Sequence, residues 1–377
     1  MKGPHEAAAE GLRGFGRKGR SRRACKGMRT MEQIKMAVLG MNQGSKTARD
    51  AVANPEVDLV AVAGRDEQDR EIAAELGVPI YDDYELLLKQ EDLDAVWISL
   101  PNQLHRIATE NAVAAGIKFI LLDKPIADTV EDAEAIIKVC NDAGATLLIG
   151  HHRRSSSKYL LLREIIDSGR LGDVVGIQSS FAIAKAHSYF DVEWRVTEGG
   201  GPLLINAIHD FDDLNYVTGA HPVKVYATTR NTIRHNPVED SAQVIVEYDN
   251  GVTAGYFISD GTPSPWNYDL AAFENPFLTM APGENSMHVF GTKGSFGFPN
   301  MDLYYYDEND FGWWSPMLHE HFEYEKIDPY VSELAHLVDL VKGRETVPRC
   351  SGENGLDTLK VINAIKESAA TGEAVRL

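Results

Sequence analysis

DAVWISLPNQLHRIATENAVAAGIKFILLDKP, residues 94–125, decides the fold, because it contains two apolar runs separated by a helical stretch. The runs at 94–100 and 118–125 favour strands buried on both faces, since neither alternates between apolar and polar residues. Residues 105–115 between them favour a helix. A strand, a helix and a second strand in this order form a right-handed unit with parallel strands.

The same alternation continues on both sides of this stretch, from residue 34 to residue 150. The further strands are expected at 34–40, 57–66, 78–81 and 146–150, and the further helices at 46–53, 69–76, 84–89 and 130–143. Strands that alternate with helices of about ten residues are typical of a parallel sheet with helices on both faces. We therefore predict a doubly wound α/β Rossmann domain over residues 34–150.

After His151 the pattern changes from alternating elements to a run of long strands. A helix is expected at 157–168, strands at 174–185, 223–232, 241–250, 252–260, 286–298 and 302–307, and later helices at 203–218, 329–342 and 354–371. The turn signals between the strands favour antiparallel pairing. We predict residues 151–377 to be an α+β domain with a large, mainly antiparallel open sheet. The helix at 354–371 is expected to pack back on the Rossmann domain.

Length and charge limit the classes of partner. With 377 residues the chain exceeds one core of common size, so two domains are expected. The net charge of −19 argues against a nucleic-acid partner, because phosphate binding needs clustered Lys and Arg. No apolar run approaches the roughly 20 residues that cross a bilayer, so no membrane partner is expected. The scattered cysteines (Cys25, Cys140 and Cys350) favour a reducing, cytoplasmic location over a disulfide framework or a zinc site.

Residues 1–33 are expected to be a basic, disordered tail. Residues 1–30 hold nine Lys/Arg and two Asp/Glu, so the remainder, with 28 basic and 54 acidic residues, carries about −26. A twin-arginine pair could belong to an export signal, but no apolar segment follows it. Disorder, or an internal start at Met28, Met31 or Met36, is the preferred interpretation.

A glycine-rich turn follows the first strand, where a doubly wound sheet can bind a dinucleotide. Gly40, Asn42 and Gly44 are the candidate residues, with backbone N–H groups and a helix N-terminus facing a pyrophosphate. Asn42 replaces the middle glycine of the usual pattern, so an ordinary strand–helix turn is an equal alternative. At the end of the second strand, Arg65 could accept the 2′-phosphate of NADP, whereas Asp66 could bind the ribose of NAD. The sequence slightly favours NADP.

At Pro101-Asn102…His105 and Asp123-Lys124-Pro125 the chain resembles the Gfo/Idh/MocA family of NAD(P)-dependent oxidoreductases. The similarity continues through GHHRRSSS, SGRLGDVVGIQ, EWRVTEGGGPLLINAIHDFDDLNYVTGA, FGTKGSFGFP and GLDTLKVINAIKESAATGEAVRL, and covers essentially everything from residue 34 onward. The resemblance implies a nucleotide-binding domain followed by a substrate-binding and oligomerisation domain, in a homo-dimer or homo-tetramer. It also implies a Lys-Pro peptide that is commonly cis. The cofactor-binding residues that it implies are Leu100, Pro101, Asn102, His105, Asp123 and Lys124.

The resemblance places Lys124 beside the nicotinamide and the reacting hydroxyl. Hydride leaves a carbinol carbon only as the hydroxyl proton leaves too, so a proton acceptor must lie at that oxygen. A buried lysine near a positively charged nicotinamide should have a lowered pKa, which brings the amine toward the range useful for proton transfer. Lys124 is therefore the first catalytic candidate.

A second group of residues lies in GGGPLLINAIHDFD, residues 199–212. His209 matches the family position that acts as a proton relay or second acid and base. Asn206 lies three residues earlier and should share its helix face, and Asp212 could orient His209. Many polyol-oxidising members carry Asp where this chain has Ile205. Because Asn cannot take a proton, Asn206 is assigned to substrate binding.

Arg154, Trp194 and Arg195 complete the substrate-binding candidates. Two arginines in a cleft would suit a carboxylate or phosphate, so the substrate is expected to be a small molecule, possibly an anion. No metal site is expected, because His151-His152 and His319-Glu320-His321 lack a third ligand at matching spacing. The expected function is an NAD(P)-dependent dehydrogenase that interconverts a secondary alcohol and a ketone on a sugar, cyclic polyol or ring-bearing hydroxy acid. The alternatives are an NAD-dependent glycoside-cleaving enzyme and a non-catalytic nucleotide-binding regulator.

Overall fold

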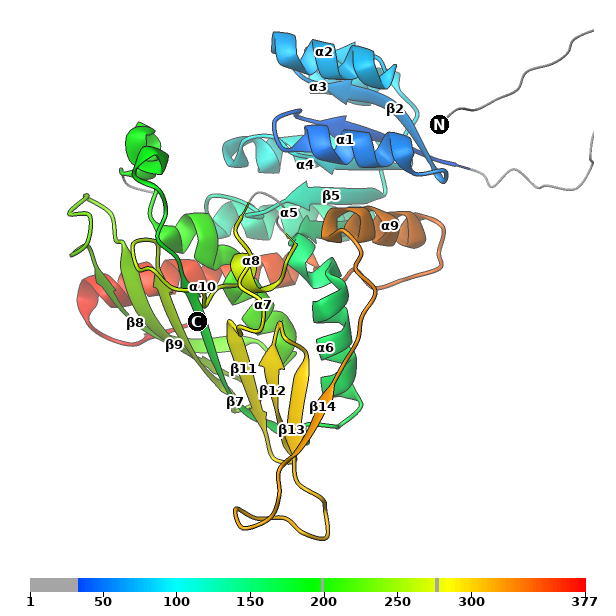
Figure 1. The fold of residues 1–377 in the computed structure, drawn as a ribbon. Coiled ribbons are helices and arrows are strands. Elements are labelled where there is room, and N and C mark those ends of the chain that lie inside the picture. Colours follow the sequence, from blue (N-terminus) through cyan, green and yellow to red (C-terminus); the bar gives the residue numbers. More distant parts are fainter. Residues whose placement is uncertain (1–32, 198–199, 275–277) are drawn as a thin grey trace, which may run out of the picture. The chain divides into compact units, whose positions relative to one another are not determined.

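The computed structural model describes residues 33–197, 200–274 and 278–377, so residues 1–32 of the tail predicted at 1–33, with Cys25, lie outside the described residues. The first sheet has six parallel strands in the order β3-β2-β1-β4-β5-β6. Their bounds are β1 Ile34–Leu39, β2 Val57–Ala63, β3 Ile80–Tyr81, β4 Ala95–Ile98, β5 Phe119–Asp123 and β6 Thr146–Gly150. The helices between them are α1 Gly44–Ala53, α2 Glu67–Leu76, α3 Tyr84–Gln90, α4 His105–Ala114 and α5 Val130–Ala143. This confirms the predicted Rossmann domain (Figure 1).

Local signals in the sequence explain where these helices begin and end. The Thr129 side chain accepts a hydrogen bond from the backbone of Asp132 at the start of α5, and Gly144 ends this helix in the left-handed conformation. Helix α2 begins two residues earlier than predicted. Its start is held by the Asp69 carboxylate, which accepts hydrogen bonds from the backbone N–H groups of Arg65 and Asp66 at 2.9 and 3.1 Å.

The second sheet has nine strands in the order β14-β13-β12-β11-β7-β10-β9-β8-β15. Their bounds are β7 Val174–Ala182, β8 Pro222–Arg230, β9 Ser241–Tyr248, β10 Thr253–Ser259, β11 Met287–Gly291, β12 Gly294–Phe298, β13 Asp302–Tyr305, β14 Leu318–His321 and β15 Val375–Arg376. All neighbouring pairs are antiparallel except β7 and β10, which run parallel. The predicted, mainly antiparallel sheet is thus confirmed, and β14 and β15 are two short strands that the sequence pattern did not indicate.

Helices α6 (Ser157–Asp167), α7 (Ile208–Thr218) and α10 (Gly352–Thr371) cover one face of this sheet (Figure 1). Their apolar side chains join those of the strands in one core, including Leu162, Phe211 and Ile365. The helix predicted at 203–218 is not regular, because residues Leu203–Ala207 form a π-helical turn before α7. That wider turn changes which side chains share a face with His209.

The last two helices connect the two sheets. Helix α9 (Pro329–Val341) packs into the core of the Rossmann domain through Leu334, Leu337 and Val338, although it follows the second sheet in sequence. Helix α10 approaches β6 closely, because a Cβ built on Gly355 would lie 2.9 Å from a side-chain carbon of Ile149. None of the helices in the described residues combines the length and the apolar composition of a membrane-spanning segment.

Candidate active site

A cavity of about 550 Å³ lies at the carboxyl ends of β1, β2 and β4, where a doubly wound sheet binds a dinucleotide. Of the predicted cofactor residues, five line it: Gly40, Asn42, Arg65, Leu100 and Pro101. The other five, Gly44, Asn102, His105, Asp123 and Lys124, are not part of its lining.

Two glycines bring the first turn against β4. Gly40 has a φ of +97°, and a Cβ built on it would lie 2.3 Å from the carbonyl oxygen of Ser99. A Cβ on Gly44 would lie 2.8 Å from a methyl carbon of Val38. The turn therefore requires glycine at both positions although it departs from the usual three-glycine pattern.

One arginine, Arg65, lines the cavity beyond the end of β2, and a second, Arg70 of α2, lies beside it. The Arg65 Nε donates a hydrogen bond to the carbonyl oxygen of Asp82 at 3.0 Å, and Arg70 pairs with the Asp82 carboxylate at 2.8 Å. Asp66 also lines the cavity. The residues needed for either ribose or 2′-phosphate recognition are therefore both present.

Asp123 and Lys124 lie at the carboxyl end of β5 and have different roles. The Asp123 carboxylate accepts hydrogen bonds from Trp97 Nε1, at 2.8 Å, and from the Ser99 hydroxyl, so it ties β5 to β4. The Lys124-Pro125 peptide is cis, as the resemblance implied. Burial lowers the pKa of Lys124, and the nearby charge of Arg153 lowers it further, while Asp123 opposes the shift.

His105 holds the two loops of the site together. Its side chain is fully buried, with Nδ1 at 3.0 Å from the carbonyl oxygen of Pro125 and Nε2 at 2.9 Å from that of Leu100. Both ring nitrogens are thus occupied by backbone oxygens. The ring therefore positions the loops that carry Leu100 and Lys124, and its contact with the cofactor stays a prediction.

Three histidines lie together beside Lys124. The ring of His209, on α7, lies 5.2 Å from that of His152 and 6.2 Å from that of His151, and His152 stacks on Tyr330 of α9 at 4.3 Å. Burial lowers the pKa of His209 well below its usual value, and the charges of Lys124 and neighbouring groups add to this effect. The buried Nδ1 of His209 has no hydrogen-bond partner among the described residues. The site thus places a neutral imidazole with a free ring nitrogen near a lysine of lowered pKa.

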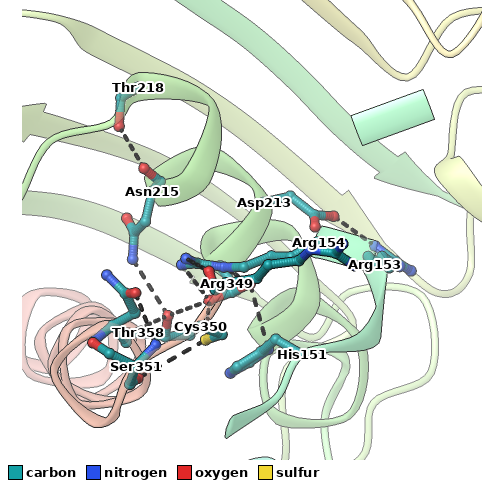
Figure 2. A network of polar contacts seen from close by, with 12 residues as sticks. His151, Arg153, Arg154, Asp213, Asn215, Thr218, Arg349, Cys350, Ser351 and Thr358 are labelled. Carbon is teal, nitrogen blue, oxygen red and sulfur yellow. Dashed lines mark hydrogen bonds and ion pairs between the residues drawn. The ribbon is translucent and has the colours of Figure 1, made fainter. Parts of the chain in front are cut away.

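The arginines at 153 and 154 have structural partners. The Nε and Nη2 atoms of Arg154 lie 2.8 and 2.9 Å from the two carboxylate oxygens of Asp212. Its Nη1 donates to the carbonyl oxygen of Arg349, and both of these arginines are labelled in Figure 2. Both side chains are buried and the guanidinium of Arg154 is occupied by these contacts, while its role in substrate binding stays a prediction. The prediction that Asp212 orients His209 is wrong, because the Asp212 carboxylate pairs with Arg154 instead.

Arg153 joins three carboxylates from two helices. It lies 3.2 Å from Asp210, 3.1 Å from Asp213 and 3.1 Å from Asp269. Burial raises the pKa of Asp213 to about 8, and Arg153 opposes that shift. This group anchors the loop after β6 to α7, which carries His209.

The remaining substrate candidates surround a lysine that the motif analysis did not single out. Lys185 Nζ donates a hydrogen bond to Asn206 Oδ1 at 2.7 Å and lies 4.5 Å from the ring centre of Tyr189. The Arg195 guanidinium lies 4.1 Å from the same ring, and Trp194 beside it is 54% exposed. Gly199, from the predicted glycine run, lies outside the described residues. Lys185 ends an apolar strand-like run, as Lys124 does, and this shared pattern could have identified it.

Comparisons with known proteins agree with this geometry. A family model described as an oxidoreductase family with an NAD-binding Rossmann fold matches residues 34–151, and a GFO/IDH/MocA C-terminal domain model matches residues 159–297. The chain is 30% identical to D-xylose 1-dehydrogenase (NADP(+)) 2 of Haloferax volcanii over 89% of this chain and 96% of that protein. It is 29% identical to inositol 2-dehydrogenase of Rhizobium meliloti over 89% and 97% of the two chains. The structure of myo-inositol 2-dehydrogenase from Lactobacillus plantarum shares the fold, with a TM-score of 0.71, 21% identity and coverage of 92% and 100%.

Proposed function

The chain belongs to the Gfo/Idh/MocA family of oxidoreductases, and from this premise we propose that it interconverts a secondary alcohol and a ketone with Lys124 and His209 moving the proton. Relatives named for D-xylose, inositol and 1,5-anhydro-D-fructose support a sugar or cyclic polyol as the substrate class. A relative named 1-carboxy-3-chloro-3,4-dihydroxycyclo hexa-1,5-diene dehydrogenase supports a ring-bearing hydroxy acid as a further candidate substrate class.

One observation carries the proposal: Lys124 lies close enough to His209 for its charge to lower the pKa of that histidine. Bound NAD(P) would accept hydride from the carbinol carbon during oxidation. The neutral amine of Lys124 takes the hydroxyl proton as the carbonyl forms, and its lowered pKa makes the neutral form available. The free Nδ1 of His209 provides a second hydrogen-bonding position for the same oxygen or for a relayed proton.

The cavity at the first turn supports a dinucleotide, and Arg65 in its lining supports NADP over NAD. Gly40 and Asn42 in the lining support a pyrophosphate there, because the backbone of a tight turn can offer N–H groups to it. Arg65 lies just beyond the end of β2 and lines the cavity, and its cationic group suits a 2′-phosphate. We therefore retain the slight preference for NADP.

We also propose that the protein forms homo-dimers or homo-tetramers through the open face of the nine-stranded sheet. Large apolar side chains are exposed on its strands, namely Val175, Tyr226, Ile245, Phe257 and Phe290. An exposed apolar surface of this kind favours association. Light scattering during size-exclusion chromatography of the full chain tests the subunit number.

The experiment that tests the function measures nicotinamide absorbance with NAD and NADP across neutral sugars, inositols, sugar acids and cyclic hydroxy acids. We expect turnover of one class by the wild type and its loss in Lys124→Met. Lys138→Met is the matched control, because that side chain is 73% exposed on α5 and pairs with Asp142. Cofactor binding without any turnover would contradict the proposal that the protein is a dehydrogenase. Cleavage of a glycoside without net cofactor reduction would instead support the glycoside-cleaving alternative.

A further inference from the structure

Lys185, Arg195 and Asn206 form a cluster of polar groups that the catalytic mechanism above does not use. Lys185 follows β7, Arg195 lies in the 3₁₀ turn Glu193–Arg195, and Asn206 lies in the π-helical turn before α7. Only 11% of the Lys185 side chain is exposed. The ring of Tyr189 lies between these elements and contacts both cations. Three separate segments therefore converge on one small region.

The free groups of this cluster are all hydrogen-bond donors. Lysine has no acceptor, so its 2.7 Å contact with Asn206 must use the amide oxygen, which leaves the amide NH₂ free to donate. The Nε of Arg195 is buried and has no partner among the described residues, while one Nη donates to the carbonyl oxygen of Tyr189. A surface that offers only donors suits a group that only accepts, as a carboxylate does.

Nearby acidic groups do not neutralise the cluster. Asp260 lies 3.8 Å from Lys185, but it also pairs with Arg234 at 3.1 Å. Arg195 makes no ion pair with another described residue. The cations Lys185, Arg195 and Arg234 thus share one directly paired carboxylate, and positive charge remains for a ligand.

The cluster is also close to the reacting groups. Asn206, near the end of the π-helical turn, precedes His209 by three residues along one continuous segment, so the two positions are separated by about 4–5 Å along the helix axis. A ligand that spans this distance could therefore reach both residues. That separation matches a hydroxyl and a carboxylate on one sugar-sized molecule.

We propose that Lys185, Arg195 and Asn206 bind a carboxylate of the substrate, which makes the enzyme a dehydrogenase of sugar acids or cyclic hydroxy acids. This inference rests on the proposed function and narrows its substrate class. Lys185 is the specificity-determining residue, since it orients Asn206 and supplies charge. A neutral polyol would leave the buried donors without an acceptor.

The ionisation of Lys185 gives an independent signature. Burial lowers its pKa to about 8; Arg234 and Arg195 lower it too, while Asp260 and Asp269 raise it. The phenol of Tyr189 faces the same amine, and burial raises its pKa, so it stays neutral in this range. Above pH 8 the free enzyme loses the ammonium, and affinity for an acid should fall while affinity for a neutral sugar does not.

The test compares matched substrates that differ only in the carboxylate: D-glucuronate with D-glucose, and D-galacturonate with D-galactose, with glucose 6-phosphate as a phosphate probe. The full chain with its preferred cofactor is assayed as wild type, Lys185→Met, Lys185→Arg and the surface control Lys138→Met. We expect the wild type to favour the acids. In Lys185→Met the KM for the acid should rise about 10- to 100-fold, as expected for one lost charged hydrogen bond. The kcat for the acid and the kcat/KM for the neutral sugar should change little. Lys185→Arg should recover most of the affinity.

Equal kcat/KM for acid and neutral sugar in the wild type would overturn the inference, as would an equal effect of Lys185→Met on both. Preference for glucose 6-phosphate would reassign the cluster to a phosphate. If no compound is turned over, the dehydrogenase proposal fails, and calorimetry of glucuronate binding to the cofactor-loaded protein then decides the subsite. Binding that Lys185→Met abolishes would support the subsite, whereas absence of binding would overturn it.

Discussion

Arg154 and Asp212 form a buried ion pair in which two guanidinium nitrogens lie 2.8 and 2.9 Å from the two carboxylate oxygens. Asp212 also accepts a hydrogen bond from Thr358 of α10 at 3.2 Å, and Arg154 donates to the backbone of Arg349. The pair therefore connects the loop after β6, helix α7 and the C-terminal segment (Figure 2). It holds in place the helix that carries His209.

Removing one partner of this ion pair should destabilise the protein strongly. We expect Asp212→Ala to lower the free energy of unfolding by about 3–5 kcal/mol, because it leaves a buried guanidinium without a countercharge. Chemical denaturation measures this change. The control is Glu75→Gln, which breaks the exposed Arg49–Glu75 pair and should leave the midpoint unchanged. Equal effects of the two substitutions would contradict the structural role of Asp212.

The rate of substrate oxidation should rise with pH as Lys124 loses its proton. Because burial lowers the pKa of this lysine, the midpoint of the rising limb should lie below 10.5. The reverse reduction uses the ammonium form, so its rate should fall as pH rises through the same range. Profiles of kcat/KM in both directions measure this. Lys124→Met should lose most activity, and the pH dependence of kcat/KM should disappear in both directions. If the variant keeps the pH dependence in either direction, another group is responsible for the titration.

His209→Gln should lower kcat about 10²- to 10⁴-fold, the range for a lost acid–base group, without weakening cofactor binding. Glutamine keeps hydrogen-bonding capacity and similar bulk but cannot relay a proton. Stopped-flow turnover and cofactor titration separate the two effects. The control is His288→Gln on β11, which should leave kcat unchanged; a kcat for His209→Gln within about threefold of wild type would remove His209 from the mechanism.

Gly40→Ala should abolish cofactor binding, whereas Gly116→Ala should not. Both glycines have positive φ, +97° and +89°, so both substitutions carry a similar backbone strain of about 1–2 kcal/mol. Only the Gly40 Cβ would meet another atom, the carbonyl oxygen of Ser99 at 2.3 Å, while nothing lies within 4 Å at Gly116. Cofactor titration and thermal unfolding of both variants check this. Equal affinities would show that the turn does not contact the cofactor.

Arg65→Ala should weaken NADP much more than NAD. The Arg65 side chain lines the cavity at the end of β2, where its charge would meet the 2′-phosphate. We expect about a 10- to 100-fold loss in kcat/KM for NADP and little change for NAD. Arg106→Ala is the control, since that arginine pairs with Glu110 on its own helix α4 and with Asp132 on α5. Parallel losses for both cofactors would reject the assignment of Arg65 to the phosphate.

The sequence predicted those elements whose signals are local. Helix α5 and strand β6 have the predicted bounds, because a capping threonine, a terminal glycine and a continuous apolar run mark them. The parallel and antiparallel sheets followed from the spacing of strands and helices. The π-helical turn at Leu203–Ala207 was missed, since no local residue signal distinguishes it from α-helix. The short strand β14 exists only because β13 pairs with it.

The sequence by itself determined the two-sheet architecture and the position of Lys124, since both depend on the order of residues along the chain. Only the tertiary structure decided which polar side chains are free to bind a ligand. The guanidinium of Arg154 pairs with Asp212, and both ring nitrogens of His105 lie at hydrogen-bonding distance from carbonyl oxygens. Lys185 donates a hydrogen bond to Asn206, which is 21 residues away in sequence. Such pairings depend on contacts between segments distant in sequence, and a buried polar group forms whichever hydrogen bond the folded chain offers it.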